Sequence, residues 1–318
     1  MTDVARREPA VLPPGGGLLL VDKPSGCTSH DVVGRVRRVL GLRRVGHAGT
    51  LDPMATGLLV VAVDRATRLL GHLALTDKTY RATIRLGVST DSDDADGSVT
   101  ATTDPSRVDD MALARAMSAL TGDLMQVPSS VSAVKVDGRR AYDRVRAGEQ
   151  VQLAARPVTV GRFDLVTPPR RGPGAIDLDV VVDCTSGTYI RSLARDVGAA
   201  LGVGGHLTEL RRTRVGPFIV DGAVDVYDGV PADRPPVTDR LVGEVLAALL
   251  PAADAVRRGF PVRQVSDEQA VDLGHGRRIT AGGIAGTYAA FDASGRLIAL
   301  LAEEGATARS VFGWQTAG

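Results

Sequence analysis

Apolar and polar residues alternate most regularly over residues 78–86, where Tyr80, Ala82, Ile84 and Leu86 interleave with threonine and arginine. Because successive side chains of a strand point to opposite faces, this alternation predicts a strand with one buried face. Short apolar runs bounded by turn residues predict further strands at residues 17–21, 57–63, 157–166 and 176–184.

Apolar residues at helical spacing occur between these strands. Ser29 is the predicted N-cap of a helix that carries Val32, Val36 and Leu40 on one face. The acidic stretch 91–96 is interpreted as a loop. Further helices are predicted at residues 65–73, 108–121, 139–147, 190–201 and 241–256.

Strands and helices follow one another without a regular βαβ repeat, which predicts an α+β fold with one mixed sheet flanked by helices. Residues 1–16 are rich in proline, glycine and charge, and we expect a disordered lead-in there. Residues 17–252 form the predicted main domain. Residues 253–318 form a predicted small β domain, in which 287–292 and 296–302 are the strands of a hairpin.

Composition narrows the classes of protein to which this chain can belong. Of its 318 residues, 44% are hydrophobic and 24% are charged, which excludes a disordered, collagen-like or disulfide-rich chain. Cys27 and Cys184 lie far apart, without the spacing of metal ligands, and we interpret them as reduced thiols. No apolar run reaches the ~18 residues of a membrane span, and the N-terminus lacks the apolar core of a signal peptide. We therefore expect a cytoplasmic protein that binds no membrane.

The segment Gly46–Leu59 places glycine, threonine and proline around one carboxylate, immediately before a predicted strand. A loop held by Gly49, Pro53 and Gly57 can present Asp52 to a ligand in a fixed geometry. The same residues also fit an aspartate that caps the turn before the strand, as in many Asp-Pro pairs. Spacing alone leaves both interpretations open.

Several motifs together resemble one family and favour the catalytic interpretation. The Asp52 segment resembles the catalytic motif of the TruB-type tRNA pseudouridine synthases, which isomerise the uridine at position 55 of the tRNA T-loop. Other blocks resemble further motifs of this family, in the family's order, and cover residues 17–218. They are Val21–Gly26 with Thr28 and Ser29, Lys78–Arg81, Pro128–Lys135 with Gly138–Tyr142, Ser186–Leu193 and Gly205–Arg214. The resemblance implies a pseudouridine-synthase fold, whose mixed sheet is mostly antiparallel.

The resemblance also implies roles for individual residues. Asp52 is the implied essential carboxylate, which acts either as a nucleophile toward the sugar or as a base that removes a sugar proton. Arg191 is implied to form an ion pair with Asp52. Tyr80 is implied to stack on a uracil flipped out of the T-loop and to assist in moving a proton. The other residues implied to lie at the substrate are His47, Tyr189, Leu210 and, in a supporting role, Lys23.

Affinity for RNA is expected to come mainly from contacts with phosphates. Arginine suits such contacts, and all but three of the 38 basic residues are arginine. Since the formal net charge is only +1, basic clusters imply one positive and one negative face. The acidic residues at 91–96 must then lie away from the phosphates or contact sugar and base. The candidates for the RNA backbone are Arg35, Arg38, Arg43, Arg44, Arg139, Arg140, Arg211 and Arg212.

The implied reaction involves neither a redox change nor transfer of a group between molecules. We therefore expect an isomerase that needs no cofactor and no metal, and the sequence contains no phosphate loop, nucleotide fingerprint or metal-ligand cluster. The expected partner is the T-arm of tRNA, with a monomeric protein and no obligatory protein partner. Residues 255–318 resemble the small RNA-binding β-barrel of the PUA type.

Two other functions stay open. The chain could be an RNA-binding or tRNA-folding protein with an idle catalytic centre, although the matched set Asp52, Tyr80, Tyr189 and Arg191 argues against it. It could also be a pseudouridine synthase for another RNA. Relatives that modify ribosomal RNA carry an Arg-Leu-Asp loop, whereas this chain has Thr-Leu-Asp-Pro at 50–53.

Overall fold

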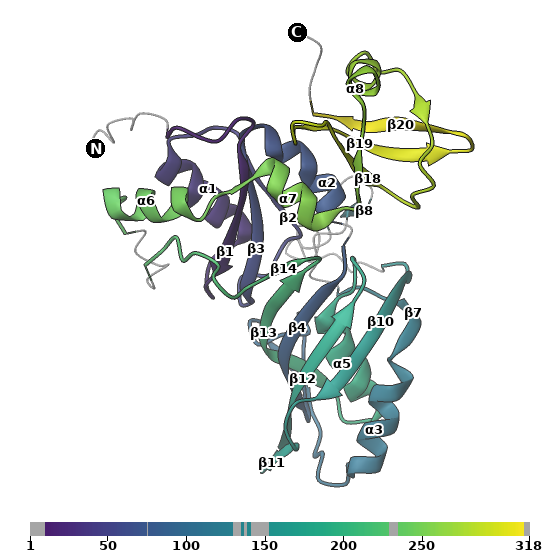
Figure 1. Ribbon diagram of the computed structural model, residues 1–318. Coiled ribbons are helices and arrows are strands. Elements are labelled where there is room, and N and C mark those ends of the chain that lie inside the picture. Colours follow the sequence, from purple (N-terminus) through teal and green to yellow (C-terminus); the bar gives the residue numbers. More distant parts are fainter. Residues whose placement is uncertain are drawn as a thin grey trace.

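Two sheets organise the protein (Figure 1), one of eleven strands and one of five. The computed structural model describes residues 10–74, 76–129, 135–136, 139–140, 153–228 and 235–314. The α+β fold and its mixed, mostly antiparallel sheet are confirmed. Within these ranges, no helix is long and apolar enough to cross a membrane.

The large sheet follows one path through eight strands. In spatial order they are β15 (Leu250–Pro251), β1 (Gly17–Lys23), β3 (Thr56–Val63), β13 (Gly205–Val215), β4 (Lys78–Leu86), β12 (Ala175–Cys184), β10 (Arg156–Leu165) and β7 (Gly122–Gln126). Three short strands branch from this path, namely β2 (Val45–Ala48) beside β3, β14 (Phe218–Ile219) beside β13 and β11 (Arg170–Gly172) beside β12. Every pairing in this sheet is antiparallel except that of β3 with β13.

The parallel pairing of β3 with β13 joins the two halves of the large sheet. Arg211 lies opposite Thr56 and Arg212 lies opposite Gly57. Gly57 has a φ of +97°, and a Cβ atom there would lie 2.3 Å from the carbonyl oxygen of Arg212. Only glycine fits this close approach of two backbones. The loop that carries Asp52 ends at this junction.

Helices pack on both faces of the large sheet at β3 and on one face at β4. They are α1 (Ser29–Leu40), the 3₁₀ helix η1 (Asp64–Leu69), α2 (Leu70–Leu73), α3 (Asp110–Ala119), α5 (Ile190–Ala200), α6 (Asp239–Ala247), α7 (Ala252–Gly259) and α8 (Asp267–Gly274). Two small hairpins complete the list, β5 (Val88–Thr90) with β6 (Val99–Thr102) and β8 (Lys135–Val136) with β9 (Arg139–Arg140).

The predicted alternation of β4 is confirmed. Its buried face packs in one cluster with Leu113 of α3 and with Ile190 and Leu193 of α5, and Figure 1 shows both helices on that side of the sheet. β3 behaves differently, because it is buried at every residue after Thr56. Its side chains alternate between two apolar clusters, one on each face. An unbroken apolar run is what a strand covered on both faces requires.

The N-cap of α1 is Thr28, so the prediction of Ser29 is wrong by one residue. The Thr28 hydroxyl accepts from the N–H of Asp31, and the Asp31 carboxylate accepts from the N–H of Thr28 at 3.0 Å. This reciprocal pair is a capping box. The hydroxyl of Ser29 is free of that task and bonds the backbone of Leu51 instead.

Three other helix predictions need correction. The segment 65–73 divides into η1 and the single turn α2. The segment 241–256 divides into α6 and α7, because Leu250–Pro251 pairs with β1 between them. At 139–147, Arg139 and Arg140 form β9 rather than helix, and the other residues lie outside the described ranges.

The small C-terminal β domain contains the predicted hairpin. Its strands lie in the order β16 (Val262–Gln264), β18 (Tyr288–Phe291), β19 (Leu297–Glu304), β20 (Thr307–Gly313) and β17 (Ile279–Thr280). This sheet packs on the large sheet through a shared apolar cluster that contains Leu58 and Phe291. At the edge of the cluster, the Arg68 guanidinium lies 4.7 Å from the ring centre of Phe312. The two sheets are therefore held together by buried apolar side chains and by an arginine stacked on an aromatic ring.

Candidate active site

Asp52 lies in the loop between β2 and β3, and a buried lysine holds this loop. The Lys23 Nζ donates to the carbonyl oxygens of Pro53 at 3.2 Å, Cys27 at 2.7 Å and Pro24 at 2.9 Å. The N–H of Gly26 donates to the same Pro53 oxygen at 3.0 Å. Burial lowers the pKa of Lys23. The lysine thus holds the backbone of the loop in place next to the Asp52 carboxylate.

The other end of the loop is held by α1. Ser29 Oγ accepts from the N–H of Leu51 at 2.9 Å and donates to the carbonyl oxygen of Leu51 at 3.1 Å. The N–H of Ala55 donates to the backbone oxygen of Asp52 at 3.1 Å, which closes a turn. Because these contacts all use backbone atoms, they fix the loop and leave the Asp52 carboxylate available.

Arg191, in the first turn of α5, holds that carboxylate with two nitrogens. Its Nε lies 3.0 Å from Asp52 Oδ2, and its Nη2 donates to Oδ1 at 3.1 Å. The Arg191 side chain is only 5% exposed, whereas that of Asp52 is 34% exposed. A paired guanidinium fork of this kind sets both the direction and the charge of a carboxylate.

A second carboxylate, that of Asp94, pairs with the same guanidinium through another nitrogen. Arg191 Nη1 lies 3.3 Å from Asp94 Oδ2 and donates to the backbone oxygen of Ser92 at 3.0 Å. Asp94 is itself fixed within its loop, because its carboxylate accepts from Ser92 Oγ and from the N–H of Asp96. The predicted loop at 91–96 is therefore part of this centre.

The charges around Asp52 act in opposite directions. Burial raises the pKa of the Asp52 carboxyl, and the negative charge of Asp94 adds to that effect. The positive charges of Arg191 and Lys23 lower it and favour the ionised form. A carboxylate poised in this way is typical of sites that do chemistry.

Tyr80 and Leu210 form an apolar wall beside the carboxylate. Both side chains are 7% exposed, and they belong to one cluster with Leu51 and Ala55 from the Asp52 loop. Burial raises the pKa of the Tyr80 phenol, so the hydroxyl keeps its proton near neutral pH. The arrangement offers a flat ring and an aliphatic surface next to a charged oxygen.

His47 lies on β2, which precedes the Asp52 loop, and Tyr189 lies at the start of α5. His47, on β2, has its pKa lowered to about 4 by burial and by the charges of His30 and Arg212, so it is neutral at pH 7. Among the described residues, its Nδ1 is buried without a hydrogen-bond partner. Tyr189 is the N-cap residue of α5 and directly precedes the turn that contains Arg191.

Family models match most of the chain. The N-terminal domain of the TruB family pseudouridylate synthases matches residues 37–190, and two C-terminal models of tRNA pseudouridine synthases match 191–228 and 260–314. The tRNA pseudouridine synthase B of Nocardia farcinica is 56% identical over 299 residues, 94% of this chain and 93% of that protein. That of Rhodococcus jostii is 54% identical over 310 residues, 97% of each chain. The chain belongs to the TruB family of pseudouridylate synthases.

A solved structure is also similar to this TruB-family chain. The crystal structure of a Cbf5-Nop10-Gar1 complex contains a chain that aligns with 99% of this chain and 92% of its own length. The TM-score is 0.69 and the sequence identity is 25%. The fold therefore extends to a relative that was crystallised with protein partners.

Two of the predicted RNA-backbone arginines are buried in the TruB-family fold, so those predictions are wrong. Arg35 is 2% exposed and donates to the backbone oxygen of Val226 at 2.8 Å. Arg212 is 1% exposed and donates to the backbone oxygens of Leu58 at 2.8 Å and Gly49 at 2.9 Å. Both guanidinium groups connect distant backbone segments and are not accessible to a phosphate.

The other arginine candidates differ in how accessible they are. Arg38 and Arg43 are exposed, and Arg44 is exposed at 3.8 Å from Asp64. Arg211 is half-buried and pairs with both oxygens of Asp22, at 2.9 and 2.6 Å. Arg139 and Arg140 lie in β9, and the structure describes only their backbone.

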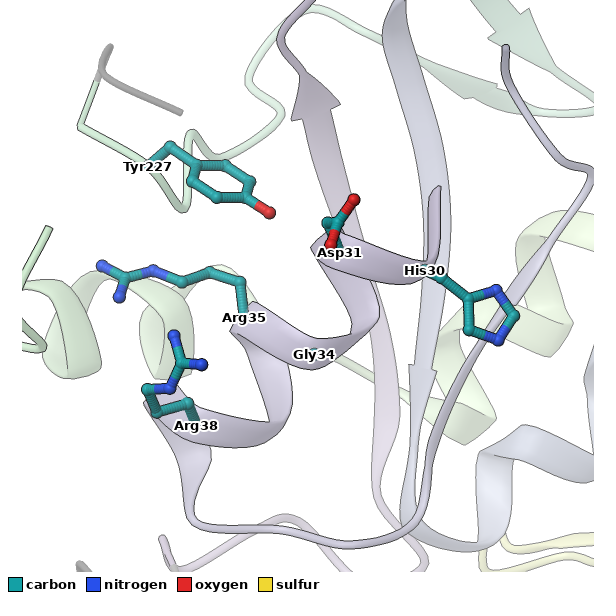
Figure 2. A pocket seen from close by; sticks show the side chains of 6 residues that line it. All are labelled: His30, Asp31, Gly34, Arg35, Arg38 and Tyr227. Carbon is teal, nitrogen blue, oxygen red and sulfur yellow. The ribbon is translucent and has the colours of Figure 1, made fainter. Parts of the chain in front are cut away.

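A cavity of about 80 Å³ lies along α1, away from Asp52. Figure 2 shows the Tyr227 hydroxyl and the Asp31 carboxylate facing one space, with Arg35 and Arg38 on one side and His30 pointing the other way. Since Asp31 caps α1 and Arg35 bonds backbone oxygens, these groups already have structural roles. The cavity is small compared with typical ligand pockets.

Sequence reasoning missed Asp94 as a member of this centre. The sequence predicts only a loop at 91–96, with four aspartates among six residues, that lies away from the phosphates or contacts sugar and base. The signal that could have found it is the excess of carboxylates beside short polar residues such as Ser92. A buried carboxylate requires a cation or several donors, and Arg191 is the cation that meets this need.

Proposed function

We propose that this protein converts uridine 55 in the T-loop of tRNA into pseudouridine. One observation carries the proposal, namely a partly exposed carboxylate, Asp52, held in a two-pronged ion pair by the buried Arg191. It stands in a chain that is 56% identical to a tRNA pseudouridine synthase B over 94% of its length. The residues at this centre match the needs of the reaction.

The reaction is an isomerisation in which all atoms of the nucleotide are kept. The N1–C1′ bond of uridine breaks, the uracil turns, C5 bonds to C1′, and the proton released from C5 is replaced by one at N1. Asp52 acts in its ionised form, either by attacking C1′ or by removing a proton from the sugar. Arg191 keeps the carboxylate charged and directed at the sugar.

The target base must leave its stack in the T-loop before Asp52 can reach its sugar. Tyr80 offers a ring on which the uracil stacks, and Leu210 offers an apolar wall. Tyr189 contacts the nucleotide from the start of α5, and neutral His47 enters the loop beside the flipped base. The protonated phenol of Tyr80 assists the proton transfer at C5.

The proposed partner is tRNA alone, bound by a monomer in the cytoplasm without an obligatory protein partner. Residues 17–252 carry the catalytic centre, and residues 253–318 add an RNA-binding domain. The exposed arginines 38, 43 and 44, together with Arg211, are the proposed phosphate contacts on the described surface. Such contacts predict affinity that falls steeply as salt is raised.

Purified full-length protein, an unmodified tRNA transcript and no added cofactor test the proposal directly. Pseudouridine mapped at single-nucleotide resolution is expected at the T-loop uridine alone. Tight binding without any modified uridine would instead support an RNA-folding protein with an idle centre. Modification of ribosomal RNA but not tRNA would identify a synthase for another RNA.

A further inference from the structure

Gln126, the last residue of β7, is 4% exposed and has a side chain that serves another element. Its Oε1 accepts from the backbone N–H of Tyr189 at 2.8 Å, and its Nε2 donates to the backbone oxygen of Tyr189 at 3.1 Å. A carboxamide that bonds both polar groups of one residue fixes the orientation of that residue's backbone. The direction of the attached side chain is fixed with it.

The residues after Gln126 hold neighbouring parts of the centre. The backbone oxygen of Val127 accepts from Arg195 Nη2 at 2.8 Å. Ser129 Oγ donates to the backbone oxygen of Ser92 at 3.1 Å. The same oxygen accepts from Arg191 Nη1. The segment 126–129 therefore connects α5 to the acidic loop. Within it, Gln126 makes the contact with Tyr189, the N-cap residue of α5.

Arg191 does not depend on Gln126 for its position. Asp94 and the backbone oxygen of Ser92 hold its Nη1, and its Nε and Nη2 face Asp52. The two hydrogen bonds from Gln126 act on Tyr189 instead. Their loss would leave the Asp52 carboxylate aimed and would remove two contacts that hold the Tyr189 backbone, whose oxygen also accepts from the N–H of Leu193 at 3.2 Å.

We propose that Gln126 is a positioning residue that directs the Tyr189 side chain toward the bound nucleotide. The inference rests on the proposed function of this centre. It assigns to Gln126 an effect on the affinity for tRNA, through Tyr189, and little effect on the chemical step at Asp52.

Gln126→Leu tests the assignment, because leucine fills a similar space and makes neither hydrogen bond. KM for the tRNA transcript is expected to rise about tenfold, while kcat changes less than about threefold. Thr121→Val is the control, since the Thr121 hydroxyl donates to the backbone oxygen of Met117 at the end of α3, next to the opposite end of β7 from Gln126. Its KM is expected to equal that of the wild type.

The Tyr189→Ala background separates positioning from a general loss of structure. Adding Gln126→Leu there is expected to leave KM unchanged, because the side chain that Gln126 directs is gone. A full tenfold rise in that background, or an unchanged KM in Gln126→Leu alone, would overturn the inference. Where Gln126→Leu lowers the Tm, Gln126→Asn replaces it: the carboxamide keeps its donor and acceptor but is one methylene shorter, so it cannot bond both polar groups of Tyr189 and is expected to raise KM in the same way.

Wild type, Gln126→Leu, Tyr189→Ala and the double variant are also compared by their Kd for tRNA. A wild type that binds tRNA but forms no pseudouridine refutes the proposed function and still decides the role of Gln126. A Kd that rises in Gln126→Leu, together with equal Kd values in Tyr189→Ala and in the double variant, supports it. Equal Kd values for wild type and Gln126→Leu refute it.

Discussion

Two loops of the protein each present an aspartate to the guanidinium of Arg191, and the two aspartates differ in how exposed their side chains are. The Asp52 side chain is 34% exposed, whereas that of Asp94 is 6% exposed. The Asp52 loop is clamped through its backbone by Lys23 and Ser29, so its carboxylate faces outward on one side. The Asp94 carboxylate bonds groups of its own loop and pairs with Arg191. Accessibility therefore separates the carboxylate that can reach a substrate from the one that holds its partner.

Asp52→Asn changes the exposed carboxylate of the pair and has the largest expected effect. The amide can neither attack C1′ nor accept a sugar proton, so kcat is expected to fall by about 10⁴-fold or more. Binding of tRNA is expected to persist, because phosphate contacts lie elsewhere. Single-turnover kinetics and a filter-binding assay measure the two quantities. Normal turnover would remove Asp52 from the chemistry.

Asp94→Asn changes the buried carboxylate of the pair. Arg191 then loses one charged partner but keeps Asp52 and the Ser92 oxygen. The expected loss in kcat is about 10- to 100-fold, the size of one charged hydrogen bond, with KM nearly unchanged. Asp110→Asn is the control, because Asp110, at the start of α3, pairs with the exposed Arg171 of β11. Equal losses in the two variants would contradict a special role for Asp94.

Arg35 and Arg38 extend the same contrast to two neighbouring basic residues of α1. Arg35→Ala removes hydrogen bonds to Val226 and Pro235 and is expected to lower the Tm by about 4–8 °C. Arg38→Ala, at an exposed position, is expected to leave the Tm unchanged and to weaken tRNA binding about two- to fivefold at low salt. Thermal melts and binding isotherms test both. Opposite results would reverse the assignment of the two residues.

The pH dependence of kcat/KM tests how the charge of Asp94 acts on Asp52. Burial raises the pKa of Asp52 above its usual 3.8, and only the ionised form works, so kcat/KM is expected to fall as the pH drops through a midpoint above 3.8. Asp94 contributes to that rise. In Asp94→Asn the acid limb is therefore expected to move to lower pH, by less than about one unit. An unmoved or raised midpoint would show that Asp94 does not act on the charge of Asp52.

Much of the fold followed from local patterns, and its central strand did not. The regular alternation of residues 78–86 predicted β4 with its boundaries. β13 was not predicted, because its pairing with β4 shifts register after Leu207 and again after Arg212. Each irregularity interrupts the period of two on which the prediction depends. Its arginines also suggested a surface segment.

The same limit applies to the candidate site. Asp52 and Arg191 were found because each lies in a motif of recognisable sequence. Asp94 needed a contact that no local pattern contains, since it meets Arg191 only after the chain has folded. Arg35 and Arg212 were placed on the surface because arginine is usually exposed. Only the arrangement of backbone oxygens around them shows why they are buried.

The parallel pairing of β3 with β13 has a consequence for protein synthesis. Asp52 is translated early, but its partner Arg191 lies 139 residues further along the chain. Arg212, which bonds the backbone oxygen of Gly49 in the same loop, lies 163 residues after Gly49. Such distant contacts close late in folding. A nascent chain that has not yet reached Val215 thus carries the carboxylate without the complete centre, and it cannot act on RNA at that stage.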